Sequence, residues 1–98
     1  MPSREPLSDD ALQDALDTLD GWTYEDDMIK TSVTLSDFRS AIGFIVRVAF
    51  EAEELNHHPE LSNVYNTVDI ALTTHDAGNQ VTALDVELAR RIDAVLAA

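Results

Sequence analysis

The stretch EELNHHPELSNVYN, residues 53–66, closes a long apolar helical pattern and holds two of the three histidines, His57 and His58. Pro59 follows at once, and a proline pushes the residue before it out of the helical region, so the helix is predicted to end here. Glu53 lies four residues before His57, which on one helix places both side chains on the same face. A small chain that gathers its imidazoles at a helix end points to a chemical role for them.

The segments around this stretch predict an α+β protein with the order α-β-β-α-β-β-α. Helical spacing and caps predict three helices: one from Ser8 to Gly21, one from Ser36 or Asp37 to Pro59, and one that begins at Thr82. Alternating apolar residues predict four strands, within residues 22–25, 29–35, 63–65 and 68–73. Asp26-Asp27 and Asn66-Thr67 are typical of the turns between paired strands. Counting in steps of two along the last strand places His75 on the face opposite its apolar residues.

The long second helix carries more apolar surface than one core-facing stripe needs. Its two stripes are Ala41, Phe44, Val48, Ala52 and Leu55, and Phe38, Ile42, Ile45 and Ala49. The pattern predicts that one side packs on the sheet and the other on a second subunit.

The chain of 98 residues fits a single domain, residues 1–98, with residues 1–6 expected to be a flexible tail. It contains no cysteine, which excludes disulfides and thiolate chemistry. The N-terminal sequence lacks the apolar core of a signal peptide, and the longest apolar stretch is interrupted by Arg47 and Glu51, so a cytoplasmic protein is expected.

The charge balance is strongly acidic, with 19 Asp and Glu against 6 Lys and Arg and a net charge of −13. Binding to nucleic acid or to an anionic membrane needs clustered cations, so neither partner is expected. A single lysine, Lys30, among so many acids favours a high-salt cytoplasm, where self-repulsion is screened. An ordinary acidic protein is the alternative interpretation, and composition leaves both open.

The three histidines suit acid–base chemistry. Glu53 on the same helix face could fix the tautomer of His57, while His58 and His75 could approach one ligand from other sides. Imidazoles near neutrality can both give and take protons, which suits a dehydration or an isomerisation. No serine lies in a nucleophile-elbow context, so covalent catalysis is not indicated.

Structural interpretations of the same residues remain open at this point. His57 alone could be a favourable charge at a helix end. Asp85 stands three residues after Thr82, where a capping-box acid needs no catalytic explanation. Three histidines and Glu53 would also suffice as zinc ligands, although adjacent histidines diverge on a helix and only Glu53 and His57 have a favourable spacing.

Taken together, the spaced residues resemble the signature of the pterin-4a-carbinolamine dehydratase family. The motif runs Glu53, three residues, His57-His58-Pro59, five residues, Tyr65, nine residues, His75, nine residues and Asp85. The surrounding sequence is similar as well, with Gly21-Trp22, an F-x-x-A-x-x-F run from Phe38 to Phe44, and VYN followed by V-x-I-x-L-x-T-H, which ends at His75. The resemblance covers nearly the whole chain, and it departs from the usual pattern at Asn56, where Asp is frequent, and in the loop DAGNQ.

The resemblance implies a four-stranded antiparallel sheet with helices packed on one face. It implies removal of water from 4a-hydroxytetrahydropterin, without metal or organic cofactor, by His57, His58 and His75. Glu53 would support them, and Asp85 would stand at the pocket edge. The substrate partner would be a small pterin, and the assembly a homodimer or homotetramer. Alternatives within the same resemblance are a non-catalytic oligomerisation or binding module, or a role in molybdopterin metabolism.

Overall fold

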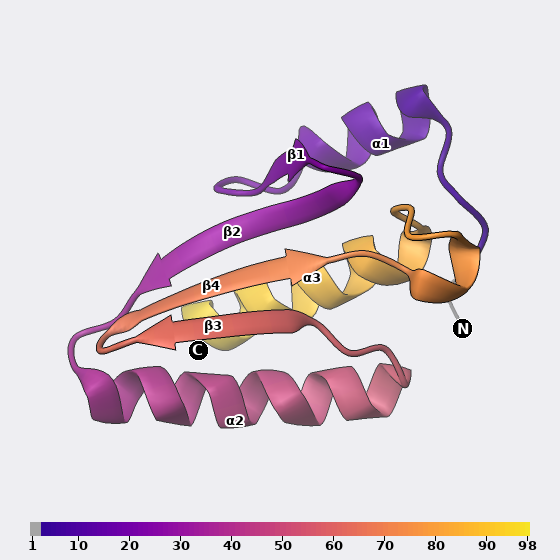
Figure 1. The fold of residues 1–98 in the computed structure, drawn as a ribbon. Helices are drawn as coiled ribbons and strands as arrows, with labels where there is room; N and C mark the ends of the chain where they lie inside the picture. The colour runs from indigo at the N-terminus through magenta and orange to yellow at the C-terminus, as the bar shows by residue number, and fades with distance from the viewer. Residues whose placement is uncertain (1–2) are drawn as a thin grey trace.

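The computed structural model describes residues 3–98, and Figure 1 shows their arrangement. The elements are α1 (Asp9–Leu16), β1 (Thr23–Glu25), β2 (Met28–Thr34), α2 (Phe38–Leu55), β3 (Glu60–Val64), β4 (Thr67–Leu72), η1 (His75–Ala77) and α3 (Ala83–Ala97). The predicted order and the α+β class are confirmed, with the 3₁₀ turn η1 added between β4 and α3.

The four strands form one antiparallel sheet in the order β1-β2-β4-β3. The pair Ile29 and Leu72 is fully buried on the face that the helices cover. Three register steps further along the same pair of strands, Ser32 and Asp69 pair on the opposite face and are exposed. Alternation along the strands therefore gives the sheet one helix-covered face and one open face.

Helix α2 supplies the centre of the core with its first stripe. Asp37 caps the helix, and the Ser40 N–H that it accepts at 2.7 Å lowers the pKa of its carboxyl. All five residues of the stripe from Ala41 to Leu55 are buried, as predicted, and they include Phe44, which is 1% exposed.

The second stripe of α2 has no partner within residues 3–98. Its large exposed side chains are Phe38, Ile42, Val46 and Phe50. Ile45, which was expected in this stripe, is half-buried and packs against the core instead. The apolar surface that the sequence predicts is present, but its large side chains in the second half of the stripe are Val46 and Phe50, each one residue after the predicted Ile45 and Ala49.

Several element boundaries differ from the sequence prediction: α1 ends earlier, α2 ends at Leu55 before reaching Pro59, and β3 starts at Glu60 and not at residue 63. Helix α1 ends at Leu16, since Thr18 and Leu19 donate backbone hydrogen bonds only three residues back and tighten the chain into a turn. This turn carries Leu19 into the core. The turn after β3 begins at Tyr65, which has a φ of 50° and whose carbonyl accepts from the Asn63 side chain.

Residues 3–6, expected to belong to a flexible tail, make specific contacts together with Leu7, which follows them. Leu7 N–H donates to the Val81 carbonyl at 3.0 Å, and Pro6 forms a bridge with Thr82. Arg4 Nη2 donates to the Asn56 carbonyl at 3.0 Å. Residues 1 and 2 of the predicted tail lie outside the described residues. The contacting segment therefore crosses the end of α2 where the histidines lie.

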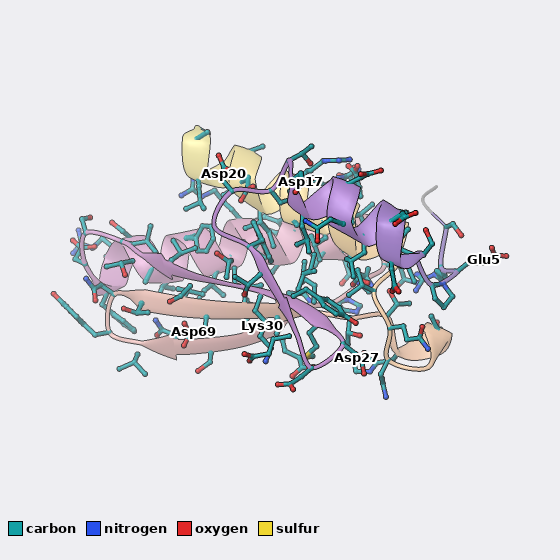
Figure 2. The ribbon with its side chains drawn as sticks, turned by 90° about the horizontal axis from the view of Figure 1, so that it is seen from above. Glu5, Asp17, Asp20, Asp27, Lys30 and Asp69 are labelled. Carbon is teal, nitrogen blue, oxygen red and sulfur yellow. The ribbon has the colours of Figure 1, made fainter. Side chains whose placement is uncertain are left out.

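The acidic side chains are spread over several elements. Figure 2 labels Asp17 and Asp20 after α1, Asp27 in the β1–β2 turn and Asp69 on β4, all of them exposed. Within residues 3–98, no helix has the length and apolar character needed to cross a membrane.

Candidate active site

His57 lies just beyond α2, in a turn that directs its ring inward. Asn56 adopts the left-handed conformation with a φ of 50°, and the N–H groups of Asn56 and His57 donate back to Glu53 and Ala52. This is the Schellman arrangement that commonly ends helices. The ring of His57 is 6% exposed, and its Nε2 lies 2.5 Å from Asp85 Oδ1.

Asp85 is fully buried, and both of its oxygens have partners. Oδ2 accepts from the Thr82 N–H and from the Thr74 hydroxyl, each at 2.8 Å. The Thr82 hydroxyl accepts from Leu84 N–H, so its own hydrogen can be donated to Thr74 Oγ1 at 2.8 Å. A buried carboxyl group needs such partners. Asp85 therefore completes the predicted capping box and at the same time holds His57.

The predicted pairing of Glu53 with His57 requires a correction. Glu53 Oε1 lies 3.7 Å from His58 Nε2, and both side chains are exposed. The i, i+4 argument assumed a helix that continues to Pro59, whereas the left-handed Asn56 ends it and rotates His57 away from the Glu53 face. The acid beside His57 is thus Asp85, from a helix 28 residues further along the chain.

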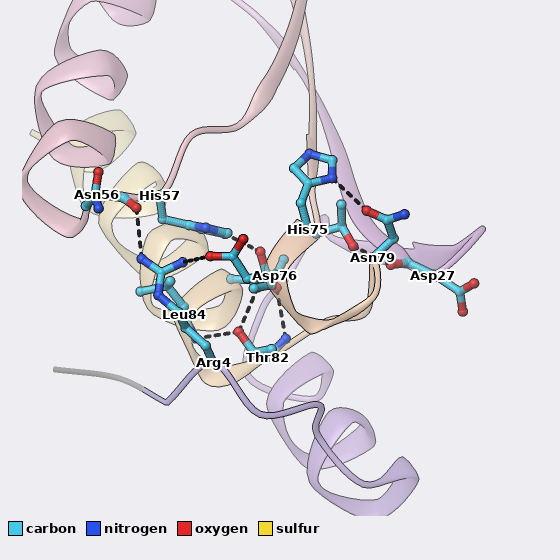
Figure 3. Close-up of polar contacts among 12 residues, drawn as sticks. Arg4, Asp27, Asn56, His57, His75, Asp76, Asn79, Thr82 and Leu84 are labelled. Carbon is cyan, nitrogen blue, oxygen red and sulfur yellow. Dashed lines mark hydrogen bonds and ion pairs between the residues drawn. The ribbon is translucent and has the colours of Figure 1, made fainter.

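His75 also differs from its expected placement. Strand β4 ends at Leu72, and His75 opens η1 rather than continuing the strand. Thr74 N–H and the Gln80 carbonyl are joined at 3.0 Å, which folds the segment between them into a closed loop. The ring of His75 is exposed, and its Nδ1 lies 2.6 Å from Asn79 Oδ1 (Figure 3).

Two sets of contacts join the segments that carry the histidines. Thr74, next to His75, binds the same carboxyl group that holds His57. Arg4 bridges the other side, since it donates to the Asn56 carbonyl and its Nη1 lies 3.6 Å from Asp76 Oδ2 (Figure 3). Sequence spacing predicted neither Thr74 nor Arg4, because no local pattern marks a residue whose partners are brought to it by the fold.

A surface hollow of about 680 Å³ lies on the open face of the sheet, and none of the three histidines lines it. Its lining includes Glu60, two residues after His58, and Ala71, near the end of β4. Lys30 also lines it, and hydrogen bonds to Glu25 and Asp26 raise the pKa of this lysine, so it stays a cation. We place the candidate site at the histidines because the groups able to transfer protons are there.

Metal ligation does not follow from this geometry. Within residues 3–98, no three histidine, aspartate or glutamate side chains form a group suited to a metal ion. The Glu53 and His57 pair that made zinc conceivable does not form, because each residue has a different partner.

The fold and the site define an α+β protein whose paired and buried acid and imidazole groups lie at one end of an antiparallel sheet. The chain belongs to the Pterin 4 alpha carbinolamine dehydratase family, whose model matches residues 5–95. It is 55% identical over 95 residues to a protein of Bradyrhizobium sp., with 95% of each chain covered. It is 52% identical over 84 residues to a protein of Opitutus terrae, covering 86% of this chain and 87% of the relative. Both relatives are provisionally named pterin-4-alpha-carbinolamine dehydratase.

A solved structure shares this fold. The chain matches a crystal structure from Brucella melitensis with a TM-score of 0.88 and 42% identity, over 93% of this chain and 98% of the other. That protein is described as a transcriptional coactivator/pterin dehydratase. The family and the fold expected from the sequence are therefore confirmed, and the family supports a dehydratase function.

Proposed function

We propose that this protein removes water from a 4a-hydroxytetrahydropterin and gives quinonoid dihydropterin, with His57 and His75 as its proton-transfer pair and His58 orienting the pterin and assisting. The observation that carries the proposal is the buried contact between His57 and Asp85, joined through Thr74 to the loop of His75. A solvated helix-end histidine would need no such network. Family membership supplies the substrate class, and the geometry supplies groups suited to its chemistry.

The reaction needs two proton transfers. One proton goes to the 4a-hydroxyl group as its C–O bond breaks, and one leaves the ring nitrogen as the C=N bond forms. Imidazoles can perform both near neutral pH. We assign the transfers to His57, held by Asp85, and to His75, while the exposed His58, beside Glu53, orients the pterin.

The proposal predicts that the purified protein accelerates dehydration of chemically generated 4a-hydroxytetrahydropterin. The absorbance change that accompanies quinonoid product formation is followed with and without protein, at one pH and at low and high KCl. High salt is included because the chain carries a net charge of −13. A rate equal to the protein-free rate in both salts would contradict the dehydratase proposal and favour a binding module of the same fold.

We further propose that the protein assembles as a homodimer or homotetramer through the exposed stripe of α2. Side chains as apolar as Phe38 and Phe50, which are 50% and 68% exposed, would otherwise face water on one continuous helix face. Their line along α2 is on the side away from the core stripe, so a second copy could pack there without disturbing the sheet.

Placing a charge in this stripe is expected to break the assembly. Phe50→Glu should shift the particle toward the monomer mass in size-exclusion chromatography with light scattering, because a carboxylate cannot be buried unpaired. Leu96→Glu is the matched control, since Leu96 is 40% exposed near the end of α3. A wild-type protein that is already monomeric, or a Phe50→Glu variant of unchanged mass, would contradict assembly through α2.

A further inference from the structure

The bond between His75 and Asn79 determines which nitrogen of His75 carries a proton. Asn79 Oδ1 lies 2.6 Å from His75 Nδ1. An amide oxygen only accepts hydrogen bonds, so the ring nitrogen facing it must carry the hydrogen. In the neutral imidazole the other nitrogen, Nε2, then holds the lone pair.

The main chain of the loop around this bond is itself hydrogen-bonded. Asn79 has a φ of 60°, in the left-handed region that asparagine tolerates, and its N–H donates to the Thr74 carbonyl at 3.1 Å. Gly78 N–H donates to the His75 carbonyl at 3.1 Å. The main-chain bonds therefore fix the backbone at both ends of the His75–Asn79 contact and keep the two exposed side chains within reach of each other.

The same loop is anchored in the buried network. Thr74, whose carbonyl receives the Asn79 N–H, is 1% exposed and donates its hydroxyl to Asp85 Oδ2. Asp85 in turn holds His57. Asn79 thus belongs to a connected set of bonds that positions two histidines, although it lies on an exposed loop and outside the sequence motif.

We infer that Asn79 is a positioning residue that holds His75 in the Nδ1–H tautomer and so makes Nε2 of His75 the proton acceptor of the site. The inference rests on the proposed dehydration and deepens it. His75 Nε2 would take the proton from the pterin ring nitrogen, and the electrons of that N–H bond would form the C=N bond. The 4a-hydroxyl group would leave as water after it receives a proton from another acid. His57 is the candidate for that acid. Without the amide oxygen, an imidazole in water favours the opposite tautomer, with the hydrogen on Nε2.

The test compares ring-nitrogen chemical shifts of ¹⁵N-histidine-labelled protein, about two pH units above the ordinary histidine pKa of about 6.5. His75 of the wild type should show a protonated Nδ1 and an unprotonated Nε2. Asn79→Gly keeps the left-handed backbone but removes the acceptor, so the shifts should move toward the Nε2–H tautomer. Asn79→Asp restores an acceptor oxygen and should restore the wild-type pattern.

Asn56→Gly is the matched control, because it makes the same change at another left-handed asparagine near the site. The Asn56 carbonyl that accepts from Arg4 remains in this variant, so the tautomer of His75 should not change. In the dehydration assay, kcat of Asn79→Gly should fall about fivefold with little change in KM, as the population of the competent tautomer falls, and Asn79→Asp should recover most of the loss.

These readouts separate the inference from the function on which it rests. An Nε2–H tautomer in the wild type, or a loss of rate in Asn79→Gly without a tautomer change, would overturn the positioning role. A tautomer change with unaltered kcat would overturn its part in catalysis. If the wild type shows the expected ring-nitrogen chemical shifts but does not accelerate dehydration, the tautomer assignment stands and the proposed function is contradicted.

Discussion

Replacing Asp85 by alanine should lower the free energy of unfolding by about 3 kcal/mol, because it removes the carboxyl group from three buried polar partners. The carboxyl group is fully buried and receives the Thr82 N–H, the Thr74 hydroxyl and the His57 ring nitrogen. Each unsatisfied buried group costs about 1–3 kcal/mol, and the first turn of α3 also loses its capping box. Urea unfolding followed by circular dichroism measures the change.

Two further variants test whether the network, rather than a lost acid, is responsible. Asp85→Asn keeps the volume and one carbonyl oxygen, so it should cost less than the alanine variant. It should still weaken dehydration, since a neutral amide offers the His57 ring nitrogen a weaker acceptor than a carboxylate does. Asp14→Ala removes an exposed acid of α1 and should change the unfolding free energy little. Equal losses in Asp85→Ala and Asp14→Ala would show that the buried network contributes nothing specific.

The sequence predicts the parts of this fold that repeat. The stripe of α2 recurs through 18 residues, and burial follows it from Ala41 to Leu55 as expected. Boundaries were less predictable, because they depend on single left-handed residues. Asn56 and Tyr65 both have a φ of 50°, a conformation that no apolar pattern records. Each shifts the end of its element, and with it the direction of the side chains that follow.

The candidate site shows the same limit more sharply. Thr82 and Asp85 were recognised as a capping box from their spacing alone, and that prediction is confirmed. The second contact of Asp85, with His57, arises because α3 packs beside the end of α2, and local spacing carries no information about that packing. The predicted pairing of Glu53 with His57 failed because it extended helical spacing past Asn56, the residue that ends the helix.

The proton-transfer assignment predicts the largest effects on activity. His57→Ala and His75→Ala should each lower kcat for dehydration by about 100- to 10,000-fold, the range typical of removing a positioned acid or base. His75 is exposed, so its alanine variant should keep the wild-type thermal melt and isolate the chemical loss. His57 is buried against Asp85, so its variant needs a melt measured alongside the rate.

The neighbouring His58 and Glu53 distinguish proton transfer from general binding. His58 is exposed and its contact with Glu53 is long, at 3.7 Å, so His58→Ala should act mainly on KM, while Glu53→Gln should leave the rate within about twofold. If Glu53→Gln lowered kcat as much as His57→Ala, the acid that supports the reaction would be Glu53 after all, and the role given to Asp85 would be lost. Unchanged rates in both His57→Ala and His75→Ala would contradict the acid–base assignment. The chain has only three histidines, so His58 would be the one imidazole left to perform either proton transfer.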